Sequence, residues 1–389
     1  MSGVFNVIVL GLVSFFTDAS SEMVYPLMPL YLARIGAGPA VLGLIEGLAE
    51  TTASLLKVFS GYVADRFRRR KPLTIAGYAA SPLGKLFIAA SGSWPMVLVG
   101  RMIDRFGKGV RNAPRDALLA EACPPERRGF TFGLHRAMDT LGAVVGTGLA
   151  IYLLTRFNQA APATYRKIFL VSLIPAALGV AALGLLKEER GEGKSLAKKL
   201  GFQWSALDRR LKAFLIFTAL FTLGNSSNMF LLLRADRLLD ARHVANPALV
   251  TLGMYLVYNL VYALVSLPAG HLSDKIGRKA LLVTGYAMYG LVYIGFALVK
   301  TPAGLWTLFA AYGLYIALTE GVEKALVADV APPHLRATMI GLHATLAGIG
   351  LYPASQLAGL LWQFFGASAP FYFGGVLGLA AAAGLALVI

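Results

Sequence analysis

Two acidic side chains stand among apolar residues near the N-terminus, where carboxylates are unexpected. Asp18 and Glu22 are four residues apart, so on a helix they lie one turn apart on the same face. Two carboxylates this close in a medium of low dielectric constant cannot both ionise cheaply, so one of them is the expected proton carrier. Pro26 and Pro29 follow directly and predict a bend in the helix beside the pair. We therefore predict that Asp18 and Glu22 bind and release a coupling proton.

A mostly cationic group lies further along the chain, again between apolar residues. Some of its cations must neutralise acids elsewhere, but a surplus that faces a cavity would select anions. Both arrangements remain open. The group consists of Arg101, Asp104, Arg105, Lys108, Arg111, Arg115 and Asp116. From it and its surroundings we predict that Asp104 and Asp139 belong to the proton path, and that Arg105 and Lys108 contact the substrate.

The elements that must position these residues are helices surrounded by lipid. Of the 389 residues, 57% are hydrophobic and 14% are charged, and the mean hydropathy is +0.65, which is too apolar for a soluble protein. Polar or Pro/Gly-rich positions divide the chain into segments long enough to span a bilayer. We predict an all-α membrane protein with twelve transmembrane helices, at residues 4–33, 39–63, 72–91, 95–121, 129–154, 165–186, 211–235, 247–270, 280–299, 303–330, 337–364 and 369–389.

Charged residues inside these spans constrain the fold strongly. Each would cost about 2.5 to 3.5 kcal/mol if it faced lipid at the bilayer centre, so a handful would outweigh a typical folding stability of about 5 to 15 kcal/mol. The charged side chains of the first half must therefore pair with one another or line water.

The loop charges predict the orientation in the membrane. Lys and Arg are frequent in segments 66–71, 126–128, 187–212 and 274–279, which all fall on one side if the spans alternate. That side is cytoplasmic by the positive-inside rule, so both termini are expected inside and the protein in the cell (inner or plasma) membrane. The net charge of +16 then reflects topology, and we expect no nucleic-acid partner.

The two halves of the chain repeat one pattern. GYVADRFRRR at 61–70 matches GHLSDKIGRK at 270–279, and Gly-Leu-His at 133–135 recurs at 341–343. Both halves begin on the same side of the membrane, so the repeat is parallel. We predict three parts: an N-terminal six-helix bundle at 1–186, a basic cytoplasmic linker at 187–210 and a C-terminal six-helix bundle at 211–389.

The doubled motif resembles the G-x-L-A-D-R-x-G-R-R/K loop of the major facilitator superfamily, although Arg68 replaces the loop glycine in the first copy. This resemblance implies the superfamily's fold of two pseudo-symmetric six-helix bundles. It also implies a cytoplasmic gate formed by the acids and bases of the two copies, which are Asp65, Arg66, Arg70, Asp274, Lys275 and Arg278.

A second resemblance lies on the fourth span. Arg101 matches the arginine that the superfamily associates with proton coupling, and the run from Arg101 to Gly129 looks like a bacterial subgroup of efflux permeases. This implies export, although the segment 142–148 lacks the Gly-Pro pair typical of exporters.

The repeat also suggests a division of labour between the halves. Asn225 and Asn228 stand where the first half has Ala19 and Glu22, so amides replace an acid, and we expect them to bind substrate. His135 and His343 occupy equivalent positions, and each could titrate near neutral pH or donate to a substrate. The predicted substrate-binding residues are Glu46, Arg105, Lys108, His135, Asn225, Asn228, Arg234 and His343. The aromatic residues Tyr25, Tyr255, Tyr258, Tyr262, Tyr352 and Trp362 could line an amphipathic pocket or could be packing residues.

These features favour a secondary transporter that works by alternating access, exporting small amphipathic or toxic compounds in exchange for protons. A transporter of organic or phosphorylated anions is the main alternative. A metal exporter is weaker, because five His and one Cys form no evident ligand cluster. An enzyme or a non-transporting receptor is disfavoured, since no hydrolase or phosphate-binding motif occurs and the acids are present. We expect no cofactor and no metal, a small-molecule substrate, protons, lipid as the surrounding solvent, and a monomer.

Overall fold

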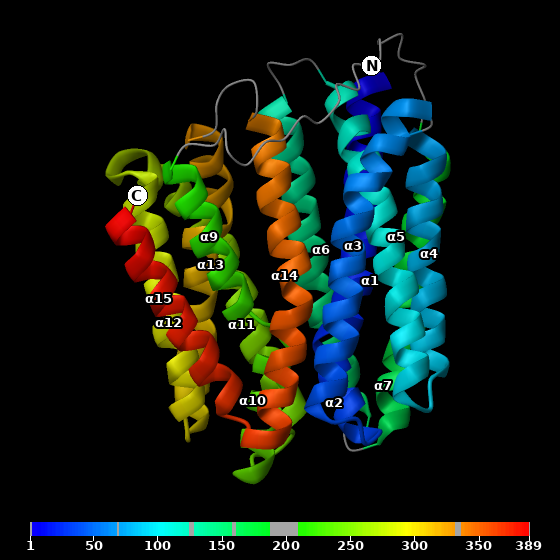
Figure 1. Cartoon of the computed structure of the whole chain (residues 1–389). Coiled ribbons are helices and arrows are strands. Elements are labelled where there is room, and N and C mark those ends of the chain that lie inside the picture. Colours follow the sequence, from blue (N-terminus) through cyan, green and yellow to red (C-terminus); the bar gives the residue numbers. More distant parts are fainter. Residues whose placement is uncertain are drawn as a thin grey trace. The chain divides into compact units, whose positions relative to one another are not determined.

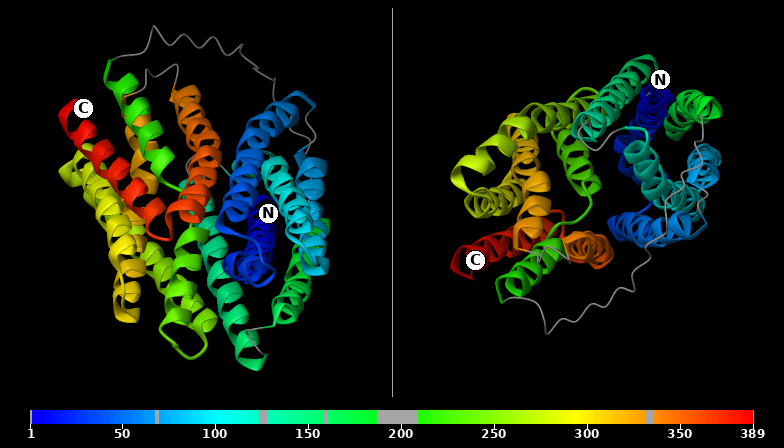
Figure 2. Two further views of the ribbon diagram at one scale, coloured as in Figure 1. Left: turned by 60° about the horizontal axis from the view of Figure 1, so that its bottom comes forward. Right: turned by 90° about the horizontal axis from the view of Figure 1, so that it is seen from above.

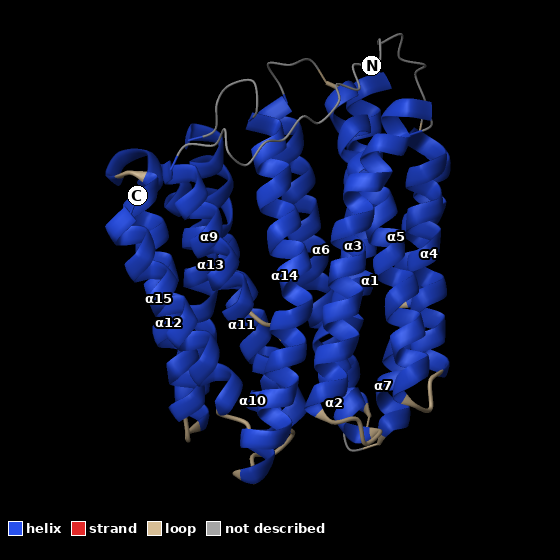
Figure 3. Cartoon of the chain, viewed as in Figure 1, coloured by secondary structure: helices blue, strands red, loops and turns tan. Residues whose placement is uncertain are grey.

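The computed structural model describes residues 2–67, 70–123, 128–157, 161–186, 209–330 and 336–388. Within these ranges the secondary structure is helical, and no strand occurs (Figure 3). The predicted segment 187–210 lies outside the described residues except for its last two positions. The expected all-helical class is confirmed.

The predicted spans correspond to the helices shown in Figure 1. Before the linker they are α1 (Ser2–Val24), η1 (Tyr25–Leu27), α2 (Met28–Arg34), α3 (Pro39–Phe67), α4 (Arg70–Ala90), α5 (Trp94–Glu121), α6 (Arg128–Arg156), α7 (Pro162–Val171), α8 (Leu173–Ala182) and η3 (Leu183–Leu185). After the linker they are α9 (Arg209–Gly224), α10 (Met229–Ala241), α11 (Pro247–Ile276), α12 (Arg278–Leu298), α13 (Pro302–Val330), α14 (Arg336–Phe365) and α15 (Ala369–Val388).

Ten helical segments of the described chain are long and apolar enough to cross a membrane. The helices α3 and α5 are not among them, and both carry charged residues along much of their length. These two helices therefore depend on protein neighbours, rather than lipid, to accommodate part of their surface.

The chain forms two compact units. The first contains residues 1–36 and 48–199, and the second contains residues 37–47 and 200–389. In the first unit α1 packs against α6 and α8, and α4 packs against α5 and α7. In the second unit α12 packs against α13 and α15, as Figure 2 shows, and α11 packs against α13. The beginning of α3 belongs to the second unit, where Gly43 adjoins the backbone of Ser355 in α14.

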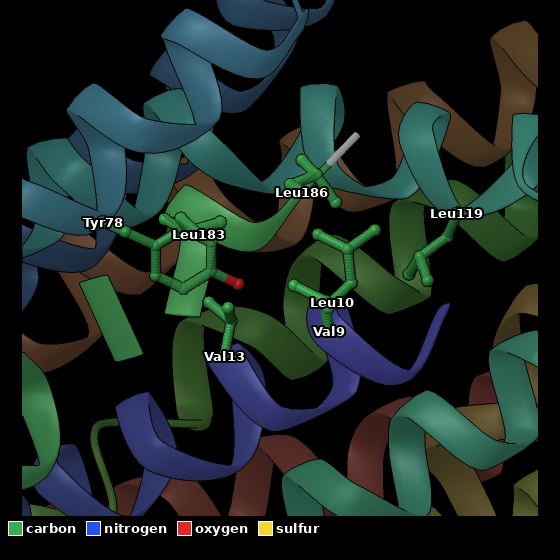
Figure 4. Packing of buried hydrophobic residues seen from close by; sticks show 7 residues of the cluster. All are labelled: Val9, Leu10, Val13, Tyr78, Leu119, Leu183 and Leu186. Carbon is green, nitrogen blue, oxygen red and sulfur yellow. The ribbon is translucent and has the colours of Figure 1, made fainter. Parts of the chain in front are cut away.

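An apolar cluster fixes α1 against α4 and α5 (Figure 4). Its buried members are Val9, Leu10, Val13, Tyr78, Leu119, Leu183 and Leu186. They come from α1, α4, α5 and the end of the sixth span. This packing brings the acids of α1 and the cations of α5 into the same unit.

The first span bends where its prolines predict. The short 3-10 turn η1 separates α1 from α2, with Pro26 inside it and Pro29 in the first turn of α2. The seventh span is also broken, between Gly224 and Met229, although no proline stands there. The hydroxyl of Tyr289 donates to the carbonyl of Gly224 at 2.7 Å, which satisfies one backbone group released by the break.

The glycine of the second loop motif has a conformational role. Gly277 lies between α11 and α12 with φ of 91°, a left-handed conformation that favours glycine. In the first copy, position 68 lies outside the described residues.

Glycines allow α6 to approach α1 closely. A Cβ atom added to Gly146 would lie 2.1 Å from the carbonyl oxygen of Ala19, whereas one added to Gly148 would meet nothing within 4 Å. We therefore expect Gly146→Ala to destabilise the protein by about 1 to 3 kcal/mol through overpacking. Gly148→Ala, two residues away on the same helix, is the matched control. Thermal unfolding in detergent measures both variants, and equal melting temperatures would contradict the close α1–α6 contact.

Candidate functional site

Charged side chains of α3 and α5 meet inside the first unit. Arg105 of α5 contacts Glu50 of α3 at 3.0 Å, and Arg101 reaches the same carboxylate at 3.6 Å. The guanidinium of Arg101 also lies 5.4 Å from the ring centre of Tyr25. Glu50 was not among the predicted site residues. Its distance of four residues from Glu46 indicated a shared helix face, but nothing in the sequence identified its arginine partners.

Asp104 holds the same two arginines from within α5. Its carboxylate lies 3.5 Å from Arg101 and 3.2 Å from Arg105, and it accepts a hydrogen bond from Ser81 of α4 at 2.5 Å. The side chains of Arg101, Asp104 and Arg105 are at most 7% exposed. Buried charges are tolerable when they are paired, and each of these three has a partner of opposite charge.

A second carboxyl contact joins α1 to α6. Asp139 accepts a hydrogen bond from Ser14, and its carboxyl group lies close to that of Asp18. Two neighbouring carboxyl groups with little access to water cannot both ionise cheaply. We predicted Asp18 to act with Glu22 on its own helix, whereas the structure places it against Asp139 of α6. Glu22 lies one turn further along α1 and is half-buried.

Three further cations lie in the same unit. Lys85 of α4 is 2% exposed and donates to the hydroxyls of Ser20 at 2.6 Å and Ser21 at 3.2 Å. Arg111 of α5 is 5% exposed, and its guanidinium lies 4.5 Å from the ring centre of Tyr78. Among the described residues, no carboxylate lies within ion-pair distance of Lys85, Lys108 or Arg111. These three cations differ in this respect from Arg101 and Arg105.

His135 lies in the second turn of α6, in the first unit. Its side chain is 5% exposed, and its Nε2 atom has no hydrogen-bond partner within the described part of the chain. Arg115 and Asp116 lie close enough to act on it electrostatically, and they pair with each other at 2.8 Å. The predicted substrate-binding role of His135 stays a prediction.

In the second unit, the predicted amides meet tyrosine hydroxyls. Asn228 accepts a hydrogen bond from Tyr312 at 2.7 Å and donates to Tyr258 at 3.4 Å. Asn225 donates to Tyr315 at 3.4 Å. Both amides lie at the break in the seventh span, so the break directs them towards α11 and α13.

These tyrosines belong to a larger aromatic cluster, of which the predicted aromatic residues are only a part. Tyr289 lies 4.1 Å from Tyr293 and 5.0 Å from Tyr315 between ring centres, and Phe221 stacks on Tyr286 at 3.8 Å. A signal was present in the sequence, because Tyr286, Tyr289 and Tyr293 repeat the helical spacing of Tyr255, Tyr258 and Tyr262. The members on α12 and α13 are Tyr286, Tyr289, Tyr293, Tyr312 and Tyr315.

Two carboxylates lie next to this aromatic cluster. Tyr262 donates to Glu320 at 2.5 Å. His343 lies 3.5 Å from Glu323 and stacks on Phe214 with ring centres 5.7 Å apart. The pseudo-symmetric histidines thus differ, because His343 adjoins a carboxylate of α13 whereas the Nε2 atom of His135 has no such partner among the described residues.

Two further predicted substrate-binding residues, Glu46 and Arg234, take part in other contacts of the second unit. Glu46, at the start of α3, belongs to the second unit and accepts from Ser227 at 3.3 Å. Arg234 donates to the carbonyls of Phe296 at 3.3 Å and Ala297 at 3.5 Å, so it caps the end of α12. Within the described residues, Arg234 makes no hydrogen bond with Asn225 or Asn228.

The predicted gate is described only in part. The side chains of Asp65, Arg66 and Asp274 lie outside the described residues. Arg70 and Arg278, at the starts of α4 and α12, are half-buried, and Lys275 is exposed. The gating role of these six residues stays a prediction.

Comparisons with known proteins agree with the helical architecture. The solved structure of the nucleoside transporter NupG superposes with a TM-score of 0.79 at 13% identity, covering 98% of each chain. A D-xylose-proton symporter superposes with a TM-score of 0.74 at 17% identity, covering 100% of this chain and 97% of its own. At such identities the likeness concerns the fold alone.

Sequence relatives extend the agreement. An uncharacterized MFS-type transporter of Methanocaldococcus jannaschii is 38% identical over 379 residues, which is 96% of this chain and 92% of that protein. The multidrug resistance protein MdtH of Photorhabdus laumondii is 23% identical over 92% of this chain and 88% of its own length. The sequence profile of the Major Facilitator Superfamily matches residues 10–235 and 215–389. The chain therefore belongs to the major facilitator superfamily, and it is a membrane transporter rather than an enzyme.

Proposed function

We propose that this protein is a proton-coupled secondary transporter that exports small amphipathic or toxic compounds by alternating access. The observation that carries the proposal is the contact between the carboxyl groups of Asp18 and Asp139. Glu50 and Asp104 lie beside Arg101 and Arg105, which stabilise their ionised forms. The Asp18–Asp139 pair is thus the acid group of this cluster best suited to exchange a proton.

The pair connects protonation to helix position. Asp18 lies on α1 and Asp139 on α6, so loss of the shared proton would leave two like charges across the α1–α6 contact. Close glycine contacts hold these helices together, and repulsion at the carboxyls opposes that packing. The break at η1 follows Asp18 by two turns, so the first span is divided close to the pair. Proton release would in this way favour a different arrangement of the first span.

Support for the substrate class comes from the second unit. Ring faces, hydroxyls and amides lie together around Asn225 and Asn228, and such a surface suits a compound with both apolar and polar parts. Support for export comes from the relatives that are named multidrug resistance proteins.

The test uses purified protein in liposomes that contain a pH-sensitive dye and carry an imposed pH gradient. Ethidium, tetraphenylphosphonium, benzoate and phosphate are added in turn, and internal pH is recorded. We expect at least one compound to drive proton movement above the level in protein-free liposomes. Accumulation of a compound that is independent of the pH gradient would contradict proton coupling.

A second candidate function is transport of an organic or phosphorylated anion. It is favoured by Lys85, Lys108 and Arg111, three cations of the first unit that are buried or half-buried and have no carboxylate within ion-pair distance in the described chain. The sign of the coupling separates the candidates, because exchange requires proton and substrate to oppose each other's binding, whereas joint transport requires them to bind together.

A further inference from the structure

The least compensated charge of the first unit lies on Arg111. The residue is only 5% exposed. Its Nε and Nη1 atoms are buried and have no hydrogen-bond partner within the described residues. A buried donor without a partner costs about 1 to 3 kcal/mol, and more when it is charged. The ring face of Tyr78 compensates part of this cost, but it accepts no hydrogen bond from these two atoms.

Lys85 and Lys108 add positive charge at the same place. Each lies close enough to Arg111 for their charges to interact. Lys85 is held by two serine hydroxyls, which are neutral. Lys108 is half-buried, so it is the most accessible of the three cations.

The nearby acids are already engaged. Glu50 and Asp104 contact Arg101 and Arg105, and Asp116 contacts Arg115. The remaining carboxylate whose charge acts on both Lys108 and Arg111 is that of Asp18. Asp18 lies beside Asp139, and among the described residues it is not within ion-pair distance of either cation.

We propose that Lys108 and Arg111 bind an anionic group of an organic substrate, a carboxylate or a phosphate, with Lys85 adding positive charge, and that this site accepts the anion when Asp18 is protonated. The proposal rests on the second candidate function and assigns its binding residues. Arginine and lysine are the usual partners of such groups. When Asp18 loses its proton, its own carboxylate competes for the same cations.

The competition has a thermodynamic consequence. If protonation of Asp18 strengthens anion binding, then by reciprocity the anion strengthens proton binding. Proton and anion would therefore occupy the protein together and cross the membrane in the same direction. For this class of substrate, the site predicts joint transport rather than exchange.

The experiment measures anion binding to the purified full-length protein by its thermal unfolding. Sodium benzoate, sodium phosphate and sodium chloride are compared with sodium HEPES at equal ionic strength, at pH 5.5 and pH 8. We expect benzoate or phosphate to raise the melting temperature of the wild-type protein, with an apparent affinity that falls by up to about tenfold per pH unit. Whichever of the two ions acts identifies the carboxylate or the phosphate as the recognised group.

Variants locate the site. Arg111→Gln and Lys108→Gln should remove the stabilisation, and Asp18→Asn should retain it with no dependence on pH. Arg156→Gln is the matched control, because Arg156 also lies over a tyrosine ring, that of Tyr152 at 5.1 Å, but is exposed. Arg156→Gln should behave as the wild type. Reduced stability of Arg111→Gln without ligand does not obscure the result, since each variant is compared with itself in HEPES.

Three outcomes would overturn the proposal: no anion effect on the wild type, an undiminished effect in Arg111→Gln, or equal stabilisation by chloride, which would indicate that any anion binds without recognition of a carboxylate or phosphate group. Proton flux in liposomes remains an independent readout. Anion binding without proton flux would remove the proposed coupling but keep the anion site. Proton flux driven by ethidium without anion binding would keep the coupling but remove the anion site.

Discussion

Replacing either carboxyl of the Asp18–Asp139 pair by an amide should reduce proton-driven flux to the level of protein-free liposomes. The reason is that Asp18→Asn or Asp139→Asn leaves one carboxyl that cannot share a proton with its neighbour. Exchange of a bound compound across the membrane without a pH gradient should persist, because the helices remain packed. Flux of the compound that is active in the dye assay, with and without the gradient, measures both quantities.

Asp240→Asn is the control for this prediction, since Asp240 is exposed on α10 and belongs to the second unit. It should leave both fluxes unchanged. Proton-driven flux that survives in Asp18→Asn and in Asp139→Asn would remove the pair from the coupling path. Loss of gradient-free exchange together with the driven flux would instead indicate a structural role.

The largest loss of stability is expected from Asp104→Asn. The variant removes the carboxylate that contacts both Arg101 and Arg105 within α5, at positions that are at most 5% exposed, and leaves Glu50 of α3 beside them. Removing one partner of a buried ion pair costs about 3 to 5 kcal/mol, because the other charge stays buried without compensation. Thermal unfolding in detergent and the yield of monodisperse protein measure this effect.

Asp116→Asn is the comparison for this second prediction. It also removes an acid from a contact with arginine on α5, at 2.8 Å, but the side chain of Asp116 is 40% exposed. Exposed ion pairs contribute about 0 to 1 kcal/mol, so its melting temperature should change little. Equal destabilisation by both variants would show that the Asp104 network is no more important to stability than a surface pair.

Features that depend on local composition could be predicted from the amino-acid sequence. The membrane spans follow from segment length and hydropathy, because a lipid solvent requires each apolar segment to satisfy its backbone internally. The bend in the first span follows from Pro26 and Pro29, and the helix ends on both sides of Gly277 follow from the repeated loop motif. The clustering of charges in the first unit follows from their cost in lipid.

Which side chains meet depends on how the helices pack and could not be predicted from the sequence. Asp18 pairs with Asp139 and not with Glu22, because the α1–α6 crossing at Gly142 and Gly146 brings the two helices within backbone contact. The tyrosine cluster likewise depends on α11, α12 and α13 packing together.

The seventh span breaks without a proline, and the Tyr289 hydroxyl from another helix satisfies the freed carbonyl of Gly224. Local sequence specifies a helix and the faces it presents, whereas partners far apart in the chain are chosen by the rotation and crossing of whole helices. The rotation and the crossing of the helices depend on the summed packing of many small residues, so no single motif encodes the pairs that form the candidate site.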